Sequence, residues 1–314
     1  MSSATTLDGV ASKPARLMSL SRREALEGYL YLTPWVIGFI AFVGGPMLAS
    51  LVLSLTNYHV VGSLQFLGLE NYVRALTDDH LFWDSLKRTF YYTLLVVPLG
   101  ITGALLAAML LNQNLAATTI YRTLFFLPSL TPVVATAILW RWIFNADVGV
   151  LNYLLWAVGI EGPGWLNSTE WAIPTLVIIT LWGTIGGNTM IIFLAGLQGV
   201  PQDLQEAAAI DGANALQRFR HVTLPMLSPT VFFNLVLGII GGLKVFALAY
   251  VATDGGPAYA TWFYALHIFA QAFKYFEMGY ASALAWMFFV VMLVFTYLQF
   301  RWSSTWVYYA GEVK

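Results

Sequence analysis

The chain has 314 residues, of which 59% are hydrophobic and only 10% are charged, and its formal net charge is −1. Soluble domains carry about 25% charged residues, so the composition excludes a soluble globular protein and indicates one that spans a membrane. The sequence contains no cysteine, which excludes disulfides, thiolate metal sites and cysteine nucleophiles.

Six apolar segments predict membrane-spanning α-helices, which need roughly 20 residues each. Short alternating strand patterns are absent, so the spans are predicted to be helical. The first segment is too long for a signal-peptide core and is predicted to stay as an anchor, led by a short interfacial helix from Arg22 to Glu27. The predicted spans are 29–55, 89–111, 123–143, 171–197, 230–251 and 278–300.

Two of these spans are predicted to be irregular. Pro128 and Pro132 interrupt the third span, and the fourth contains the glycine-rich sequence WGTIGGN at 182–188. Membrane helices tolerate such breaks where neighbouring helices satisfy the freed backbone groups.

The basic residues predict the orientation of the chain. With the N-terminus in the cytoplasm, nine basic residues fall in inside segments and five in outside segments, as the positive-inside rule requires. The uncharged run 257–273 is a little short for a span, and it predicts either an external or re-entrant helix or a seventh crossing. Arg301, just beyond the last span, favours six crossings.

The longest polar segment of the second half, 198–229, begins with a predicted helix near Leu204. Asp203 can cap this helix, and Glu206 in its first turn interacts favourably with the helix dipole. Small residues follow, so the predicted helix is slim, and another protein could hold it in a cleft. One face carries Leu204, Ala207, Ala208 and Asp211.

A turn and a second short helix complete this segment. Gly212 stands where a helix ends in a left-handed residue. The second helix is predicted over 213–221, with Leu216 and Phe219 on its apolar face, and Pro225 is predicted to stop it. Two interpretations are open: an interfacial hairpin packed on its own bundle, or a docking surface for another protein.

The segment resembles the cytoplasmic EAA loop of ABC-importer permeases. Glu206-Ala-Ala, Asp211-Gly212-Ala213, Phe219 and Leu224-Pro225 match that loop, and only Val222 departs, where isoleucine is common. In that family the loop is a coupling helix that docks on an ATPase subunit. The residues that the resemblance assigns to coupling are Asp203, Glu206, Ala207, Ala208, Asp211, Gly212, Ala213, Phe219, Leu224 and Pro225.

The resemblance covers roughly residues 25–305. FLGLENY at 66–72, Phe82-Trp83, YRTLFFLPSLTP at 121–132 and TDGGPAYAT at 253–261 resemble the sugar-permease branch, the relatives of the maltose and glycerol-phosphate permeases. Their order along the chain carries the argument more than any one of them does.

The fold that the resemblance implies is an all-α integral membrane protein with about six transmembrane helices, the ABC type I importer transmembrane domain. The expected organisation is a cytoplasmic tail (1–28), a first helix with an external loop (29–84), the transmembrane domain (85–302) with its coupling loop (198–229), and a cytoplasmic tail (303–314).

The resemblance also implies an ATP-driven importer of a sugar, oligosaccharide or polyol derivative in a bacterial or archaeal cytoplasmic membrane. The expected partners are a second homologous permease, two ATPase subunits, an extracytoplasmic solute-binding protein and membrane lipid, but no nucleic acid. No cofactor, metal or catalytic residue is expected in this chain, because ATP and Mg are used by the partner ATPase.

A solute pathway is predicted beside the coupling loop. Its candidate residues are Trp182, Asn188, Gly242, Lys244 and Val245. An aromatic ring and an amide can stack on and hydrogen-bond a sugar, although small residues in membrane helices also serve close packing. Lys244, a charge deep in a predicted span, either lines the path or snorkels to an interface or partner.

Other chemistries lack the residues that they need. The histidines, His59, His80, His221 and His267, have no metal spacing and are predicted to be solvated. No phosphate-binding P-loop occurs. A self-sufficient secondary carrier is the alternative function, but no acidic residue lies within a predicted span to relay protons. A membrane enzyme is disfavoured because no nucleophile–base pair is apparent.

Overall fold

The computed structural model describes residues 20–59, 64–113 and 117–308. Within these ranges the regular structure is helical, apart from one isolated antiparallel bridge between Thr56 and Phe66. The chain divides into two compact units, residues 1–52 and residues 53–314. Most of the predicted N-terminal tail, and positions 309–314 of the predicted C-terminal tail, lie outside the described residues.

The first unit is a single long apolar helix. It comprises α1 (Leu20–Phe39), a π turn η1 (Ile40–Gly44) and α2 (Gly45–Ser54), and the stretch Ser21–Ser54 is long and apolar enough to cross a membrane. This confirms the first predicted span. The separate interfacial helix is wrong, because Arg22 and Glu27 belong to the same continuous helix.

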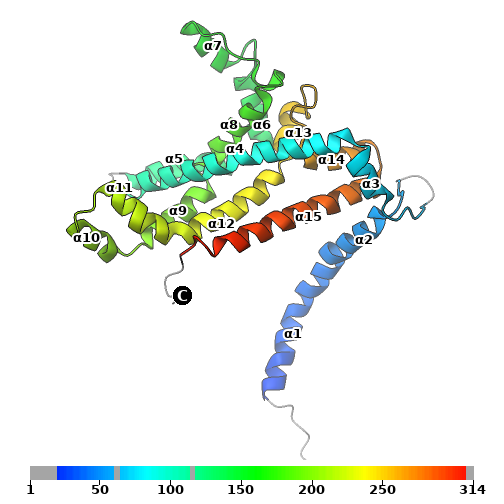
Figure 1. The fold of residues 1–314 in the computed structure, drawn as a ribbon, viewed down its shortest axis with the longest axis horizontal. Coiled ribbons are helices and arrows are strands. Elements are labelled where there is room, and N and C mark those ends of the chain that lie inside the picture. Colours follow the sequence, from blue (N-terminus) through cyan, green and yellow to red (C-terminus); the bar gives the residue numbers. More distant parts are fainter. Residues whose placement is uncertain (1–19, 60–63, 114–116, 309–314) are drawn as a thin grey trace, which may run out of the picture. The chain divides into compact units, whose positions relative to one another are not determined.

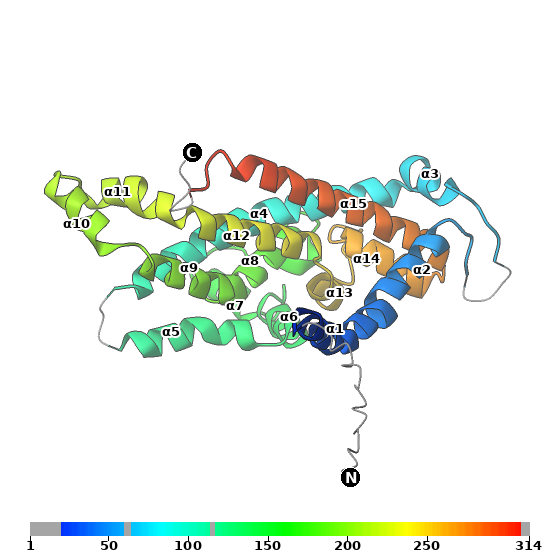
Figure 2. The same cartoon turned by 90° about the horizontal axis from the view of Figure 1, so that it is seen from below.

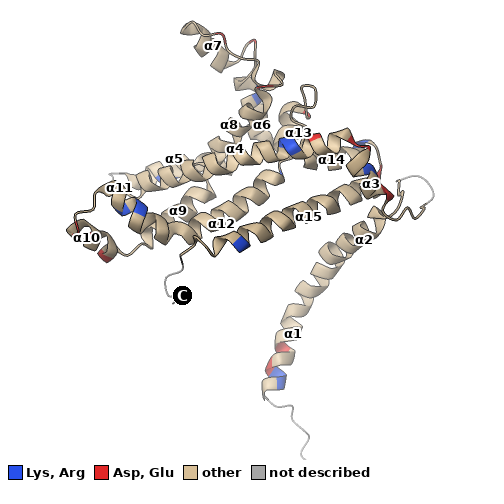
Figure 3. Ribbon diagram, viewed as in Figure 1, with Lys and Arg blue, Asp and Glu red and all other residues tan. Residues whose placement is uncertain are grey.

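The second unit is a helical bundle in which α4, α12 and α15 lie side by side in both views (Figure 1 and Figure 2). Figure 3 shows that its charged residues gather near the helix ends and leave long uncharged stretches between them. Its helices are α3 (Glu70–Thr77), α4 (His80–Leu111), α5 (Thr118–Phe126), η2 (Leu127–Leu130), α6 (Val133–Ile143), α7 (Val150–Ala157), η3 (Trp165–Asn167), α8 (Ala172–Thr184), α9 (Asn188–Gln198), α10 (Gln202–Ile210), α11 (Ala215–Arg218), η4 (Phe219–Thr223), α12 (Leu224–Leu243), α13 (Ala247–Thr253), α14 (Tyr264–Phe269), η5 (Ala270–Lys274) and α15 (Met278–Ser303).

The number of candidate spans in the structure agrees with the six predicted from the sequence. Over the described chain, four helices are long and apolar enough to cross a membrane, and two bent pairs raise the number to six if each pair is one span. The pair Thr118–Leu130 and Val133–Ile143 bends by 94°, and the pair Ala172–Thr184 and Asn188–Gln198 bends by 48°. Both breaks fall at the predicted prolines and glycines. A seventh crossing is not found, since α14 and η5 have only 6 and 5 residues.

Pro225 does not stop a helix, contrary to the sequence prediction. α11, η4 and α12 form one apolar stretch from Ala215 to Leu243. The π turn η4 ends with the Leu224 N–H bonded to the Phe219 carbonyl, directly before the proline. η1 stands in the same relation to Pro46, with Gly45 closing the turn. A proline lacks an N–H, and the widened turn lets the helix continue through it.

The fifth predicted span is broken near its end. α12 stops at Leu243, and α13 begins only at Ala247. Between them Phe246 has φ −144° and ψ −68°, and the Val245 N–H turns back to the Gly242 carbonyl. Lys244 therefore stands at a helix end with its side chain exposed in the isolated chain, rather than inside a continuous span.

α4 begins nine residues before the predicted span, because Asp79 caps it. The Asp79 Oδ1 atom accepts hydrogen bonds from the Leu81 and Phe82 amides at 2.9 and 3.2 Å. Two free backbone donors at the helix N-terminus are thereby satisfied. The polar segment before the predicted span is thus partly the first turns of the helix.

The second carboxylate oxygen of Asp79 joins α4 to two later helices. Oδ2 accepts hydrogen bonds from His267 Nε2 of α14 at 2.8 Å and from the Tyr280 hydroxyl of α15 at 2.7 Å. The indole N–H of Trp262 donates to His267 Nδ1 at 3.2 Å. An indole nitrogen can only donate, so Nδ1 accepts and the Nε2 proton faces Asp79. We call these four residues the Asp79 junction.

The prediction that His267 is solvated is wrong, since only 1% of it is exposed. His59, His80 and His221 are exposed, as predicted. The sequence position of His267 in a polar stretch gave no sign of its partner, Asp79, which is 188 residues away.

We expect Asp79→Asn to lower the free energy of unfolding by about 2–4 kcal/mol, because charge-assisted hydrogen bonds are lost and an amide NH2 is placed against two donors. Thermal unfolding of the purified chain in detergent measures this loss. Asp78→Asn is the matched control, since the neighbouring Asp78 side chain is exposed. Equal unfolding temperatures for the two variants would show that the junction contributes nothing.

The Asp79 junction also predicts how stability depends on pH. Burial raises the pKa of Asp79, but hydrogen bonds from His267, Tyr280 and the Phe82 amide outweigh it and lower the pKa from 3.8 to about 2. A carboxylate with a depressed pKa stabilises the fold above its unfolded pKa. Its contribution is therefore complete above about pH 4 and is lost as the pH falls toward 2. Unfolding of Asp79→Asn, followed over the same range, should lack this component.

Candidate functional site

The polar segment forms a helical hairpin that stands at one end of the bundle (Figure 1 and Figure 2). Its first arm, α10, ends in a Schellman motif. The Gly212 N–H donates to the Ala209 carbonyl at 3.1 Å and the Ala213 N–H donates to the Ala208 carbonyl at 2.9 Å. Gly212 has φ +83°, which confirms the predicted left-handed residue at this position.

The second arm begins with a capping box. The Asn214 side chain accepts a hydrogen bond from the Gln217 amide at 2.9 Å, and the Gln217 side chain accepts one from the Asn214 amide at 2.8 Å. The arms are also tied across the hairpin by Gln205 Nε2, which donates to Thr223 Oγ1 at 2.8 Å. The hairpin therefore has a fixed turn and a fixed angle between its arms.

We expect Asn214→Ala to lower the free energy of unfolding by about 1 kcal/mol, because the substitution removes an N-cap hydrogen bond. Thermal unfolding of the purified chain in detergent measures the effect. Asn214→Asp keeps an acceptor at the cap and should retain most of the stability. The prediction fails if the alanine and aspartate variants behave alike.

The predicted coupling residues take different places on this hairpin. Asp203 lies in the first turn of α10 and does not cap it, because the N-cap residue is Pro201 and makes no side-chain bond. The observed N-cap therefore lies two residues before the predicted one. Most of the set lies on the surface: Asp203, Glu206, Ala207, Asp211, Gly212 and Leu224 are exposed, and Ala208, Ala213, Phe219 and Pro225 are half-buried.

Two large apolar residues of the hairpin are highly exposed; Leu216 was predicted on the second helix, and Ile210 was missed from the sequence. Ile210 is 87% exposed and Leu216 is 74% exposed, one on each side of the turn. Exposed apolar side chains that gather at one place form a surface on which another protein can dock. The signal for Ile210 in the sequence was its position directly before Asp-Gly.

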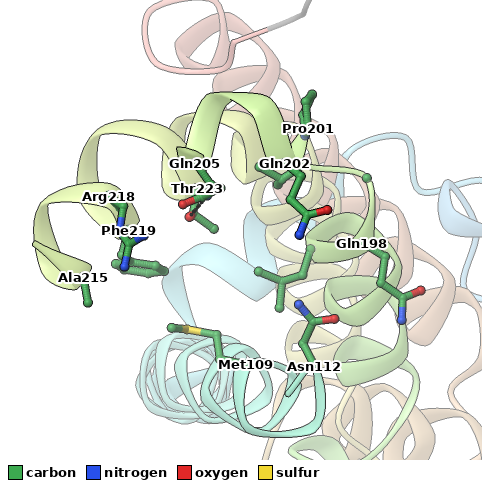
Figure 4. A pocket seen from close by; sticks show the side chains of 13 residues that line it. Met109, Asn112, Gln198, Pro201, Gln202, Gln205, Ala215, Arg218, Phe219 and Thr223 are labelled. Atoms are coloured by element: carbon green, nitrogen blue, oxygen red, sulfur yellow. Dashed lines mark hydrogen bonds between the residues drawn. The ribbon is translucent and has the colours of Figure 1, made fainter. Parts of the chain in front are cut away.

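A cleft of about 740 Å³ lies between the hairpin and the ends of α4 and α9. In Figure 4 the side chains of Arg218 and Phe219 come from the hairpin, while Met109 of α4 and Asn112, directly after α4, line the other side of the cleft. Most of the other polar lining is uncharged amide, from Gln198, Gln202 and Gln205. A space large enough for water therefore separates this part of the hairpin from the ends of α4 and α9.

The three breaks in the bundle meet around a central cavity of about 340 Å³. η2 and the start of α6 supply one wall, the end of α8 a second, and the link between α12 and α13 a third. Trp182 and Val245, two of the predicted pathway residues, line this cavity. The hydroxyl groups around it belong to Tyr92, Ser129, Thr131, Thr136, Thr180 and Thr184.

A second, adjoining cavity of about 250 Å³ shares residues with the central one, among them Tyr92 and Thr180. The Tyr92 hydroxyl and Thr180 Oγ1 lie 2.6 Å apart and join α4 to α8. Gly242 lines this second cavity and lies against Thr93, whose Cγ2 a β-carbon would meet at 2.9 Å. Asn188 and Lys244 line neither cavity, so the structure does not bring the five predicted pathway residues together.

None of the described residues that line these two cavities is acidic. In the described part of the chain, no group of three or more His, Asp or Glu side chains could hold a metal ion. The arrangement can bind a hydroxyl-rich solute through hydrogen bonds and one indole face.

The fold is that of solved ABC importers. The chain superimposes on a bacterial transporter that imports the acidic polysaccharide alginate with a TM-score of 0.80, over 90% of this chain and 96% of that one, at 24% identity. The same importer bound to its alginate-loaded periplasmic protein gives 0.79. The fold therefore defines a multi-pass, all-α membrane protein.

The chain belongs to the family described as the binding-protein-dependent transport system inner membrane component, which matches residues 97–304. It is 45% identical to the probable ABC transporter permease protein YesP of Bacillus subtilis, over 93% of this chain and 94% of that protein. The lactose permease LacF of Rhizobium radiobacter is 38% identical, over 90% and 95%. The trehalose/maltose permease MalF of Thermococcus litoralis is 34% identical, also over 90% and 95%. The chain is a permease subunit of a binding-protein-dependent ABC importer.

Proposed function

We propose that this permease carries a sugar, oligosaccharide or polyol derivative. The observation that carries the proposal is the central cavity, where hydroxyl groups and the Trp182 indole surround a space free of acidic side chains. Sugars are bound by hydrogen bonds to such groups and by an aromatic face, as small-molecule sites generally combine apolar walls with a few placed polar groups. The names of the lactose and trehalose/maltose relatives point the same way.

The exposed hairpin would be the part of this chain that receives the force for transport. An ATPase subunit docked on it would contact Glu206 and Asp211 as polar groups and Ile210 and Leu216 as apolar anchors, all exposed. The fixed turn at Gly212 would pass movement of the ATPase to α12, with which the second arm is continuous. ATP and Mg would be bound by that partner, and this chain would hydrolyse nothing.

The complete importer would contain this chain, a second homologous permease, two ATPase subunits and an extracytoplasmic solute-binding protein. It would lie in the cytoplasmic membrane, with the N-terminus and the hairpin inside. The bias of basic residues toward the inside segments supports this orientation. A proton-coupled carrier would need a proton-relaying acid, and the two cavities have none among their lining residues.

Purification of the tagged chain in mild detergent tests the subunit composition. An ATPase and a second permease in stoichiometric amounts are expected, and reconstituted vesicles should take up a radiolabelled sugar only with ATP and the binding protein. Uptake that needs a proton gradient but no ATP, by a chain that purifies alone, would refute the proposal. Uptake of an amino acid in place of any sugar would refute the solute class only.

A further inference from the structure

A third cavity lies apart from the two that contain the predicted pathway. It encloses about 470 Å³ at the C-terminal ends of α6 and α13 and shares no residue with the central cavity. Its polar lining comes from three separate stretches of chain: Arg141 and Asn145, then Asn167, then Asp254. Tyr250, which is 38% exposed, adds an aromatic ring. We call this space the Arg141 cavity.

The charges around the Arg141 cavity do not cancel. Asp254 is already paired, because Lys274 Nζ lies 3.1 Å from its Oδ1 atom. Among the described residues, no acidic side chain lies within 4 Å of the Arg141 guanidinium. Arg141 occupies the last turn of α6, where the helix dipole favours a cation. The cavity therefore carries one guanidinium without a matching anion.

The wall opposite Arg141 is rigid. Asp254 has φ +46°, and the loop after it is closed by a 2.6 Å contact between the hydroxyls of Thr253 and Thr261. Thr261 Oγ1 also donates to the Gly256 carbonyl at 2.8 Å. A β-carbon on Gly255 would lie 2.4 Å from the Trp262 ring, so the loop is packed as closely as glycine allows. Non-glycine residues with positive φ are held only where the surroundings fix them.

We propose that the Arg141 cavity is a saccharide subsite that selects an acidic sugar residue, with Arg141 binding the carboxylate of a uronate. A guanidinium binds a carboxylate through two parallel hydrogen bonds. Asn145 Oδ1 already accepts hydrogen bonds from the Asp147 and Val148 amides, so the groups available to ring hydroxyls are the Asn145 NH2 and the Asn167 amide. Tyr250 offers a ring face. The subsite rests on the proposed sugar import. It would hold the acidic end of a solute on its way to the central cavity.

A single engineered thiol tests the subsite without knowledge of the natural solute. Asn167→Cys would be the only cysteine in this chain, and it lines the cavity with an exposed side chain. In spheroplasts the thiol would be labelled from outside with a membrane-impermeant maleimide. The probes are D-galacturonate, D-galactose and acetate. Galacturonate should slow labelling at concentrations roughly tenfold lower than galactose or acetate requires.

Three further substitutions in the Asn167→Cys background separate charge from structure. Arg141→Gln should abolish the preference for galacturonate. Asp254→Asn should strengthen protection by galacturonate, since it removes the only anion of the lining, and asparagine tolerates a positive φ. Lys87→Gln removes a positive charge that does not line the cavity and should change nothing.

Each other outcome would overturn the subsite. A thiol that is never labelled would show that the cavity is closed to the outside. Equal protection by galactose and galacturonate would refute selection of an acidic sugar, and equal protection by acetate would leave a simple anion site. Because labelling needs no transport, sugar uptake without any protection would refute the subsite alone. Protection without sugar uptake would refute the proposed function alone.

Discussion

Gly186→Ala is expected to abolish uptake and to lower the stability of the chain by about 1–3 kcal/mol or more, the usual cost of forcing atoms into a packed interior. A β-carbon at Gly186 would lie only 1.9 Å from the Phe125 carbonyl oxygen and 2.7 Å from its carbonyl carbon. These are backbone atoms of α5, which no side-chain rotation can move aside. The link between α8 and α9 would have to move away from α5. The walls of the central cavity formed by the end of α8 and by η2 would then move apart.

The matched control lies three residues earlier. A β-carbon on Gly183 meets nothing within 4 Å, and alanine is more favourable than glycine inside a helix such as α8, so Gly183→Ala should unfold at the same or a higher temperature than the unchanged chain. Thermal unfolding, measured on both variants, checks the prediction. If Gly186→Ala were as stable as Gly183→Ala, the close approach of α5 to this break would be disproved.

Gly212→Val is expected to reduce uptake at least tenfold while the protein still reaches the membrane in normal amounts. The glycine holds φ +83°, and its β-carbon position is open, so the cost is one of backbone conformation and not of collision. A β-branched residue held at positive φ is strained by about 1–3 kcal/mol. The Schellman motif would open, and the first arm would leave the turn in another direction.

The informative comparison is Gly212→Asn, because asparagine adopts the left-handed conformation far more readily than valine does. It should keep most of the uptake. ATP-dependent uptake and ATPase activity, both normalised to protein in the membrane, separate loss of coupling from loss of the complex. Equal activity of the valine and asparagine variants would mean that the turn conformation does not matter for transport.

The span pattern could be predicted because membrane crossing depends on length and apolarity, which are local properties of the sequence. The last predicted span began at Met278, where α15 begins. The breaks at Pro128–Pro132 and at Gly186–Gly187 could also be predicted, since proline and glycine mark irregular backbone wherever they stand. The left-handed turn at Gly212 followed from the same kind of signal.

The errors arose where distant contacts decide the structure. The early start of α4 depends on Asp79, whose second oxygen is held by His267 and Tyr280, and no local pattern announces that pairing. The break after Leu243 has no proline, and its two sides pack into different buried clusters, Leu243 into one and Val245 and Leu248 into another. The error at Pro225 was the opposite one. The proline was predicted to end a helix, but the π turn before it lets the helix continue.

The candidate site was predicted in part. The position and turn of the hairpin followed from the sequence, but the cap, the tie between Gln205 and Thr223, and the exposed Ile210 required the structure. Of the predicted pathway, Trp182 and Val245 share a cavity, whereas Asn188 does not reach it. Spacing along the chain cannot show which face of a broken helix turns inward, because each break rotates the residues that follow it.

The three helix breaks around the central cavity have a consequence for how the subunit is turned about the membrane normal. Each break leaves backbone N–H and C=O groups outside the regular helix pattern, and lipid tails cannot satisfy such groups within the hydrocarbon of a membrane. The side formed by η2, the end of α8 and Lys244–Phe246 must then look toward protein or water. The lipid boundary is left to intact surfaces such as the exposed apolar side of α15, with Val290, Leu293 and Val294.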